Sequence, residues 1–188
     1  MGILAGDALL NYAYETAAGA FDIEPENPRI GRAFQILTRK AGIYGMVGGQ
    51  VVDVESEGTS GMTREKLDFI YRLKTGALLE SAMAIGAVLA GATEEEQKLI
   101  ETVAGEVGLA FQIQDDILDV TGTLEVLGKP IGSDEKNRKA TYVSFEGLEQ
   151  AKRDVAEISE RAIARMETLS VKNEFLTELL RFLISREK

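Results

Sequence analysis

The sequence contains no cysteine and no histidine, and only 3 of its 188 residues are proline. Without cysteine the chain has no disulfide framework, no thiolate nucleophile and no thiolate metal site. Without histidine it has no Ser-His-Asp triad, no histidine acid–base catalyst and no His-based zinc or iron site. Any chemistry must therefore use carboxylates, Lys or Arg, hydroxyls, amides or a metal ion. The missing thiols favour a reducing compartment, and we expect a cytoplasmic protein.

Acidic residues outnumber basic ones by 31 to 21, which gives a net charge of −10. This charge disfavours nucleic acid and anionic membrane surfaces as partners, although a few lysines and metal ions that converge on one pocket can still bind a polyanion. Nothing at the N-terminus resembles a signal peptide. Residues 75–92 are nearly uncharged, but Glu80 interrupts them and Gly, Ala and Ser are abundant. We therefore predict a buried central helix there, and no membrane span.

Apolar residues recur mostly at helical spacing, and no segment is a convincing strand. The pattern predicts six helices over residues 7–19, 29–55, 63–91, 93–121, 144–169 and 173–185. Residues 122–142 contain Pro130, several glycines and many charges, which is typical of a loop. No internal repeat or linker is visible, so we expect one all-α domain over residues 1–188.

Asp115, Asp116 and Asp119 form a DDxxD motif inside an otherwise apolar helical segment. In a helix, residues four apart share a face, so Asp115 and Asp119 point the same way and Asp116 lies beside them. Three carboxylates so close together repel one another, and a divalent cation is the simplest way to stabilise them. Ligands that are all oxygen favour Mg²⁺, which binds through one or two carboxylates together with water and substrate phosphates.

Lys74 falls on the core-facing side of its predicted helix, so its ammonium must either snorkel to solvent or meet an anion. Thr75 and Gly76 follow it, and a hydroxyl beside a small residue suits the close approach of a phosphate. Gln112 shares the helix face of Asp116 and Asp119. Its amide could equally satisfy a buried backbone group or contact a ligand.

Four cations lie close together after the aspartates, namely Lys129, Lys136, Arg138 and Lys139. They suit a solvated loop, but their place directly after a predicted metal site also suits a clamp for a diphosphate. Gly48 and Gly49 stand in the middle of a predicted helix, where glycine often permits close packing or a ligand. Asp53 follows shortly after, and we predict a helix–helix contact for this piece.

Taken together, these residues resemble the trans-isoprenyl diphosphate synthases, the farnesyl/geranylgeranyl diphosphate synthase family. The resemblance rests on an ordered set that covers essentially the whole chain: Gly6-Asp7-Ala8-Leu9-Leu10, Gly48-Gly49-Gln50, Lys74-Thr75-Gly76, Phe111-Gln112 with Asp115-Asp116 and Asp119, Gly128-Lys129, Gly132-Ser133-Asp134, Asn137 and Lys139. The DDxxD motif alone is only moderately specific, whereas the ordered set is strongly so.

The resemblance implies an all-α isoprenoid-synthase helical bundle that condenses isopentenyl diphosphate with an allylic diphosphate to a farnesyl- or geranylgeranyl-type product. It assigns Mg²⁺ binding to Asp115, Asp116 and Asp119. It places a further set of residues at the allylic diphosphate, namely Lys74, Thr75, Gln112, Lys129 and Lys139. It also implies a homodimer.

One departure from the family concerns its N-terminal part, which carries the first aspartate-rich motif and the basic residues for isopentenyl diphosphate. That segment has no counterpart here, so we expect an N-terminally truncated bundle that is inactive alone. A non-catalytic helical partner subunit of a full-length synthase is the alternative, and intact Lys74 and DDxxD residues argue against it. A terpene cyclase is a third possibility, which the Lys-Thr-Gly set and the Gly128–Asp134 loop disfavour.

Overall fold

The computed structural model describes residues 1–57, 61–122 and 140–185. No strand occurs in these ranges, which confirms the predicted all-α class. The helices are α1 (Gly2–Ala18), α2 (Ala20–Ile23), α3 (Pro28–Ala41), α4 (Met46–Ser56), α5 (Arg64–Ile70), the π-helix η1 (Tyr71–Gly76), α6 (Ala77–Ala90), α7 (Glu94–Thr121), α10 (Tyr142–Glu146), α11 (Leu148–Met166) and α12 (Glu174–Ser185).

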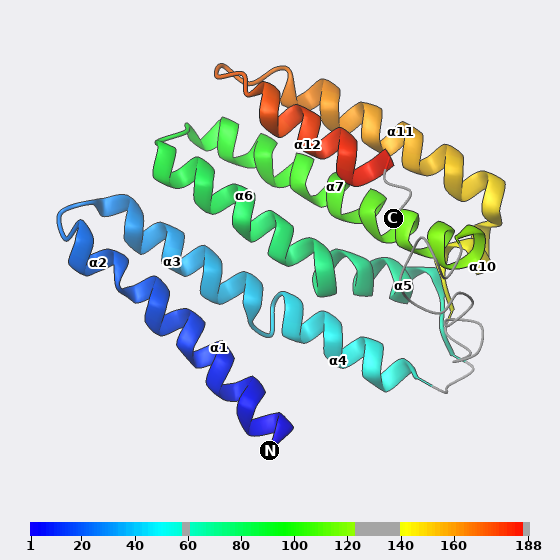
Figure 1. The fold of residues 1–188 in the computed structure, drawn as a ribbon, viewed down its shortest axis with the longest axis horizontal. Coiled ribbons are helices and arrows are strands. Elements are labelled where there is room, and N and C mark those ends of the chain that lie inside the picture. The colour runs from blue at the N-terminus through cyan, green and yellow to red at the C-terminus, as the bar shows by residue number, and fades with distance from the viewer. Residues whose placement is uncertain (58–60, 123–139, 186–188) are drawn as a thin grey trace.

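The long helices lie side by side, and neighbours along the chain are mostly neighbours in space (Figure 1). α6 packs between α3 and α7, and α7 packs in turn against α11 and α12. α1 lies at the edge of the bundle, and none of its residues is buried. The centre of the molecule is therefore formed by the continuous α5–η1–α6 segment and by α7.

Among the described residues, three apolar clusters hold these helices together. The largest joins α5, η1, α7, α10 and α11 and includes Leu67, Ile113 and Val155. A second joins α7, α11 and α12 around Val103, and a third joins α3 to α6 around Ile36. Burial of each such side chain contributes about 1.5–3 kcal/mol, so α7 and α11, which each enter two clusters, are the main supports of the fold.

The predicted boundaries of α7 are confirmed almost to the residue. The Thr93 side chain accepts a hydrogen bond from the Glu96 backbone N–H, and the Glu96 carboxylate accepts one from the Thr93 N–H. This reciprocal capping box satisfies two amide groups at the start of the helix. α6 ends just before it at Ala90 and is capped by Gly91, whose φ of 83° lies in the left-handed region that favours glycine.

The prediction of one continuous helix over residues 29–55 is wrong. α3 ends at Ala41, and α4 begins at Met46. Between them the chain turns back so closely that a Cβ on Gly45 would lie 1.8 Å from the Lys40 carbonyl oxygen. The predicted start of the next-to-last helix at residue 144 is also wrong, because Gly147, with a φ of 82°, separates α10 from α11.

The stretch Arg64–Ala90 is long and apolar enough to cross a membrane, judged by length and composition alone. Core helices of soluble proteins meet the same criterion. Its C-terminal part, α6, lies between α3 and α7, as predicted for a central helix. Lys74 and Glu80 form ion pairs with Asp53 and Lys40 within the bundle. That it does not span a membrane stays a prediction.

Candidate functional site

The Lys-Thr-Gly motif lies in the π-helix η1, between α5 and α6. π-Helical turns are rare and are frequent at functional sites. A glycine faces η1 from each side. A Cβ on Gly49 of α4 would lie 2.4 Å from the Lys74 backbone nitrogen, and one on Gly108 of α7 would lie 2.9 Å from the Gly76 Cα. The motif is therefore enclosed between α4 and α7, and only glycine permits this spacing. The helix–helix contact predicted for the paired glycines is confirmed at Gly49, whereas a Cβ on Gly48 would meet the Ile43 carbonyl oxygen in the preceding turn.

The Lys74 ammonium pairs with an anion, which is one of the two alternatives that its sequence position left open. Its Nζ lies 2.5 Å from Oδ2 of Asp53, whose side chain is 5% exposed, while that of Lys74 is 33% exposed. Asp53 lies four residues after Gly49, so both lie on the face of α4 that contacts η1. The sequence predicts only a helix–helix contact for the segment that contains Asp53. This four-residue spacing is the signal that could have identified it as the partner of Lys74.

The three aspartates follow on the last turns of α7 and have different surroundings. Asp116 and Asp119 are buried, whereas Asp115 is half-buried. Oδ2 of Asp116 accepts hydrogen bonds from the Tyr71 hydroxyl and, at 2.6 Å, from the Tyr142 backbone N–H. One oxygen of Asp116 therefore accepts two hydrogen bonds from the protein, whereas the DDxxD motif predicts that this carboxylate binds a cation.

Within the described ranges, no three acidic side chains come close enough together to hold a metal ion. The residue types still fit Mg²⁺, which needs only one or two protein carboxylates and takes its remaining ligands from water and substrate phosphate. Asp115 and Asp119, one helical turn apart, provide such a pair. The assignment of the metal site stays a prediction.

The other predicted diphosphate ligands divide into two groups. Thr75 lies in η1 beside Lys74, and Gln112 lies on α7 one turn after Gly108, the glycine that contacts η1. Both side chains are half-buried. Lys129 and Lys139 lie outside the described residues.

Tyr142 and Arg64 form a polar group next to Asp116. The Tyr142 hydroxyl donates a hydrogen bond of 2.8 Å to Oδ2 of Asp154, and the Arg64 guanidinium lies 4.0 Å from the centre of the Tyr142 ring. Burial raises the pKa of the Tyr142 phenol, and the hydrogen bond to Asp154 acts in the same direction. Burial acts to lower the pKa of Arg64, but Asp68 and Tyr142 outweigh it and keep the guanidinium charged. A neutral phenol and a cation therefore face each other at ordinary pH.

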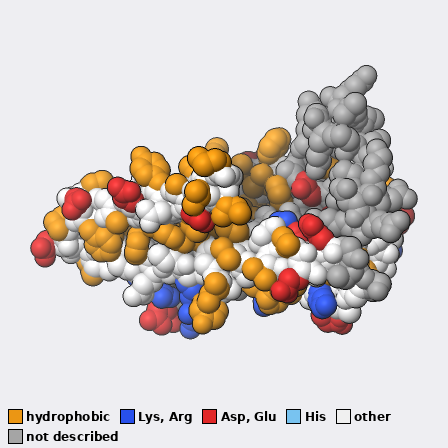
Figure 2. Space-filling view, turned by 90° about the horizontal axis from the view of Figure 1, so that it is seen from below, with side chains coloured by type: hydrophobic (Ala, Val, Ile, Leu, Met, Phe, Trp, Pro, Cys, Tyr) orange, Lys and Arg blue, Asp and Glu red, His pale blue; other side chains and the backbone are white. Residues whose placement is uncertain are grey.

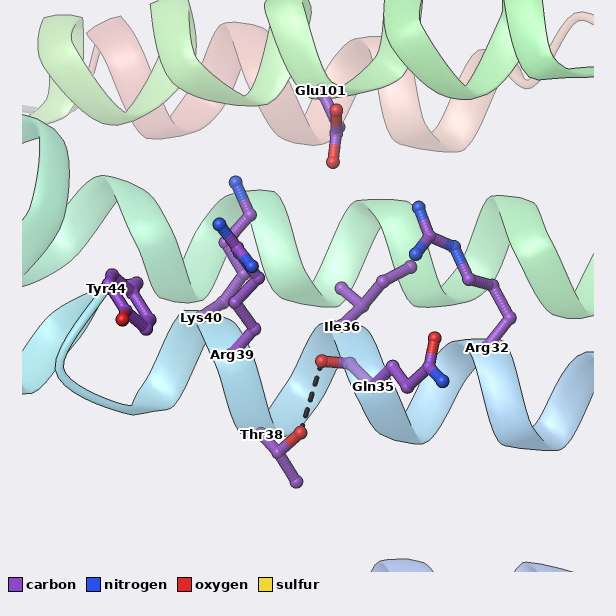
Figure 3. Close-up of a pocket in the computed structure, with 8 residues that line it drawn as sticks. All are labelled: Arg32, Gln35, Ile36, Thr38, Arg39, Lys40, Tyr44 and Glu101. Atoms are coloured by element: carbon purple, nitrogen blue, oxygen red, sulfur yellow. Dashed lines mark hydrogen bonds between the residues drawn. The ribbon is translucent and has the colours of Figure 1, made fainter.

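A cavity of about 650 Å³ lies elsewhere, over α3 (Figure 3). Its lining consists of Arg32, Gln35, Ile36, Thr38, Arg39, Lys40, Tyr44 and Glu101. Glu101 precedes Asp115 by about four turns on α7, or roughly 20 Å along the helix axis. Lys40 pairs with Glu80, and the Arg39 guanidinium lies 5.2 Å from the Tyr44 ring centre. Its lining includes none of the predicted site residues that the structure describes.

These observations define an all-α protein in which the π-helix that carries Lys74 and Thr75 packs against the helix that carries the DDxxD motif. A sequence profile described as polyprenyl synthetase matches residues 1–179. The chain therefore belongs to the polyprenyl synthetase family, as its motifs predicted.

The relatives are similar over most of this chain. The geranylgeranyl diphosphate synthase of Cyanophora paradoxa is 48% identical over 151 residues, which are 80% of this chain and 50% of that protein. The farnesyl diphosphate synthase of Geobacillus stearothermophilus is 38% identical over 188 residues, which are 100% of this chain and 63% of that protein. The chain thus spans between half and two thirds of the length of these curated relatives.

Solved structures agree with the fold. A geranyltransferase of Helicobacter pylori, complexed with magnesium and isoprenyl diphosphate, superposes with a TM-score of 0.79 at 31% identity over 97% of this chain and 58% of that one. An FPP/GFPP synthase of Zymomonas mobilis superposes with a TM-score of 0.81 at 28% identity over 96% and 60%. The predicted isoprenoid-synthase bundle is confirmed.

Proposed function

We propose that this chain forms part of the active site of a Mg²⁺-dependent short-chain prenyltransferase, which condenses isopentenyl diphosphate with an allylic diphosphate to a farnesyl- or geranylgeranyl-type diphosphate. The observation that carries the proposal is the contact between η1 and α7. Gly108 and Gly76 bring Lys74 and Thr75 alongside the helix that carries Gln112 and the aspartates.

Each side chain has a role that its chemistry allows. Lys74 supplies a positive charge and Thr75 a hydroxyl donor to the allylic diphosphate, and Gln112 adds an amide donor from α7. Lys129 and Lys139 would add charge to the same group. Asp115 and Asp119 would hold Mg²⁺, which when bound neutralises charge on the departing diphosphate.

The reaction fits a chain without histidine. The allylic C–O bond breaks, and its electron pair leaves with the diphosphate, which Lys74 and Thr75 help to stabilise. The double bond of isopentenyl diphosphate then attacks the allylic carbon, and a proton is lost from the product. The departing diphosphate can accept that proton, so no side-chain base is needed.

Calorimetry of a short allylic diphosphate against the chain tests the proposal. We expect binding with Mg²⁺ and none with excess EDTA, and loss of binding in Asp115→Ala with unchanged helicity by circular dichroism. Equal affinity of parent and variant would contradict the metal assignment. A parent that binds nothing would favour the alternative role, a non-catalytic partner of a full-length synthase.

The chain spans only part of its relatives, so we expect no condensation activity from it alone. Incorporation of labelled isopentenyl diphosphate by the purified chain would contradict this expectation.

Homodimerisation is part of the same proposal. Several large apolar side chains of α1 are exposed, among them Ile3 at 83% and Leu9 at 70%. Figure 2 shows hydrophobic side chains along the side of the molecule seen from below. Exposed apolar surface of this kind commonly marks an interface. Sedimentation equilibrium should give a dimer, and a monomer at all concentrations would contradict this part of the proposal.

A further inference from the structure

Three buried residues from three helices meet at one carboxylate oxygen. Tyr71 of η1, Asp116 of α7 and Tyr142 of α10 are 5%, 8% and 5% exposed. The Tyr71 hydroxyl and the Tyr142 backbone N–H both donate to Oδ2 of Asp116. The single carboxylate therefore joins α7 to two elements that precede and follow it in the chain.

The surroundings of this group are apolar. Tyr71 and Tyr142 belong to the same core cluster as Leu67, Ile113 and Ile117. A carboxylate beside such a cluster is costly unless donors satisfy it, and hydrogen bonds to an ionised carboxylate are stronger than those between neutral groups. The two protein donors account for the burial of Asp116 without any cation.

Residues of α5 and α11 hold Tyr142 in place. Tyr142 is held on one side by its hydrogen bond to Asp154 of α11, and Gln150 donates to the other oxygen of that carboxylate at 2.8 Å. On the other side it is held by Arg64 of α5, which also pairs with Asp68 at 2.9 Å and with Glu146. Tyr142 is therefore a rigid donor to Asp116.

We propose that Asp116, with Tyr71 and Tyr142 as its partners, is a positioning residue that sets η1 against the end of α7. Tyr71 lies three residues before Lys74, and Asp116 lies between Asp115 and Asp119. The hydrogen bond between them therefore fixes the distance from the diphosphate-binding lysine to the metal-binding carboxylates. This inference rests on the proposed function. It gives the aspartates of the DDxxD motif different roles: Asp115 and Asp119 bind the cation, and Asp116 positions η1 against α7.

Substitution by asparagine separates a positioning residue from a ligand. An amide oxygen can still accept the two hydrogen bonds, but it is a poorer ligand for Mg²⁺ than a carboxylate. We expect Asp116→Asn to keep the calorimetric affinity for inorganic pyrophosphate with Mg²⁺ within about threefold of the parent, whereas Asp115→Asn loses about tenfold or more. Equal losses in the two variants, with unchanged melting temperatures, would overturn the inference.

Tyr71→Phe tests the same hydrogen bond from its donor side. It leaves all carboxylates in place, and we expect it to weaken pyrophosphate binding by about tenfold, because loss of the hydrogen bond lets η1, and with it Lys74, shift relative to the carboxylates of α7. Tyr12→Phe, at an exposed tyrosine of α1, is the matched control and should bind like the parent. If Tyr71→Phe lowers only the melting temperature and keeps the parent affinity, the group is merely structural and the inference fails. A parent chain that binds no pyrophosphate would overturn the proposed function, and the positioning role with it.

Discussion

The ammonium of Lys74 and the carboxylate of Asp53 form an ion pair across the contact between η1 and α4, with Nζ and Oδ2 2.5 Å apart. Asp53 is almost fully buried, whereas a third of the Lys74 side chain remains accessible. Asp53 therefore orients the Lys74 side chain, and the exposed part of that side chain remains available to a second anion. In the proposed function, a diphosphate would bind Lys74 while Asp53 keeps the lysine oriented.

The first prediction concerns the asymmetry of this pair. Lys74→Met leaves a buried carboxylate without its cation, and we expect it to lower the free energy of unfolding by about 2 kcal/mol. Asp53→Asn leaves a lysine that can reach solvent, and the loss should be smaller, about 1 kcal/mol or less. Urea denaturation of both variants measures the difference.

The double variant is the control for this asymmetry. Asp53→Asn combined with Lys74→Met should cost less than the sum of the single changes, with a coupling of about 1 kcal/mol. Additive effects would mean that the two groups do not interact in solution.

The second prediction concerns the spacing between α4 and η1. Gly49→Ala places a methyl group 2.4 Å from the Lys74 backbone nitrogen and 2.8 Å from the Leu73 Cβ, so the two elements must move apart. Overpacking of this kind costs about 1–3 kcal/mol, and the shift should also weaken Mg²⁺-dependent pyrophosphate binding through Lys74. Thermal unfolding and calorimetry measure the two effects.

Gly86→Ala is the matched control for Gly49→Ala. Gly86 lies in α6, and a Cβ there meets nothing within 4 Å. The change should raise the free energy of unfolding by up to about 1 kcal/mol, because alanine favours the helix more than glycine does. A destabilised Gly86→Ala, or an unaffected Gly49→Ala, would contradict the packing described here.

The sequence predicted the long helices well where capping residues and apolar periodicity agree, as they do in α7. It did not predict the break between α3 and α4. Gly42, Gly45, Gly48 and Gly49 follow one another within a few residues, and nothing in the local pattern distinguishes a glycine that ends a helix from one that permits packing. The π-helical turn of η1 was likewise not predicted, since its residues have no composition of their own.

The candidate site was predicted in part for a physical reason. Helical periodicity indicates which face a residue occupies, so Lys74 and the aspartates could be placed on core-facing or shared faces from spacing alone. Periodicity does not identify the partner across the bundle. Tyr71 and Tyr142 lie far from Asp116 in the chain and meet it only through the packing of η1 and α10 on α7. The division of roles within the DDxxD motif therefore depends on tertiary structure.

The third prediction concerns acid and the start of α7. The Ser170 hydroxyl and the Thr93 backbone N–H donate to the Glu96 carboxylate and hold its pKa below the ordinary value of 4.5. Because the folded pKa is lowered, the unfolded chain takes up the proton first as the pH falls. The contribution of Glu96 is therefore complete above pH 4.5 and is lost as the pH falls from there through the folded pKa.

Glu96→Gln tests whether protonation of Glu96 lowers the stability of the fold in acid. The amide oxygen can still accept from Thr93 but cannot titrate, so the variant should lose less stability than the parent between about pH 6 and about pH 3.5. Melting temperatures of both proteins across that range measure the difference.

Glu95→Gln is the control, because Glu95 lies in the same helical turn outside the capping box and its change should leave the parent's acid dependence largely intact. If Glu96→Gln and the parent lose stability in parallel as the pH falls, the ionisation of Glu96 contributes nothing measurable to the stability of the fold. A steeper loss in Glu96→Gln than in the parent would reverse the sign and exclude a lowered pKa for Glu96.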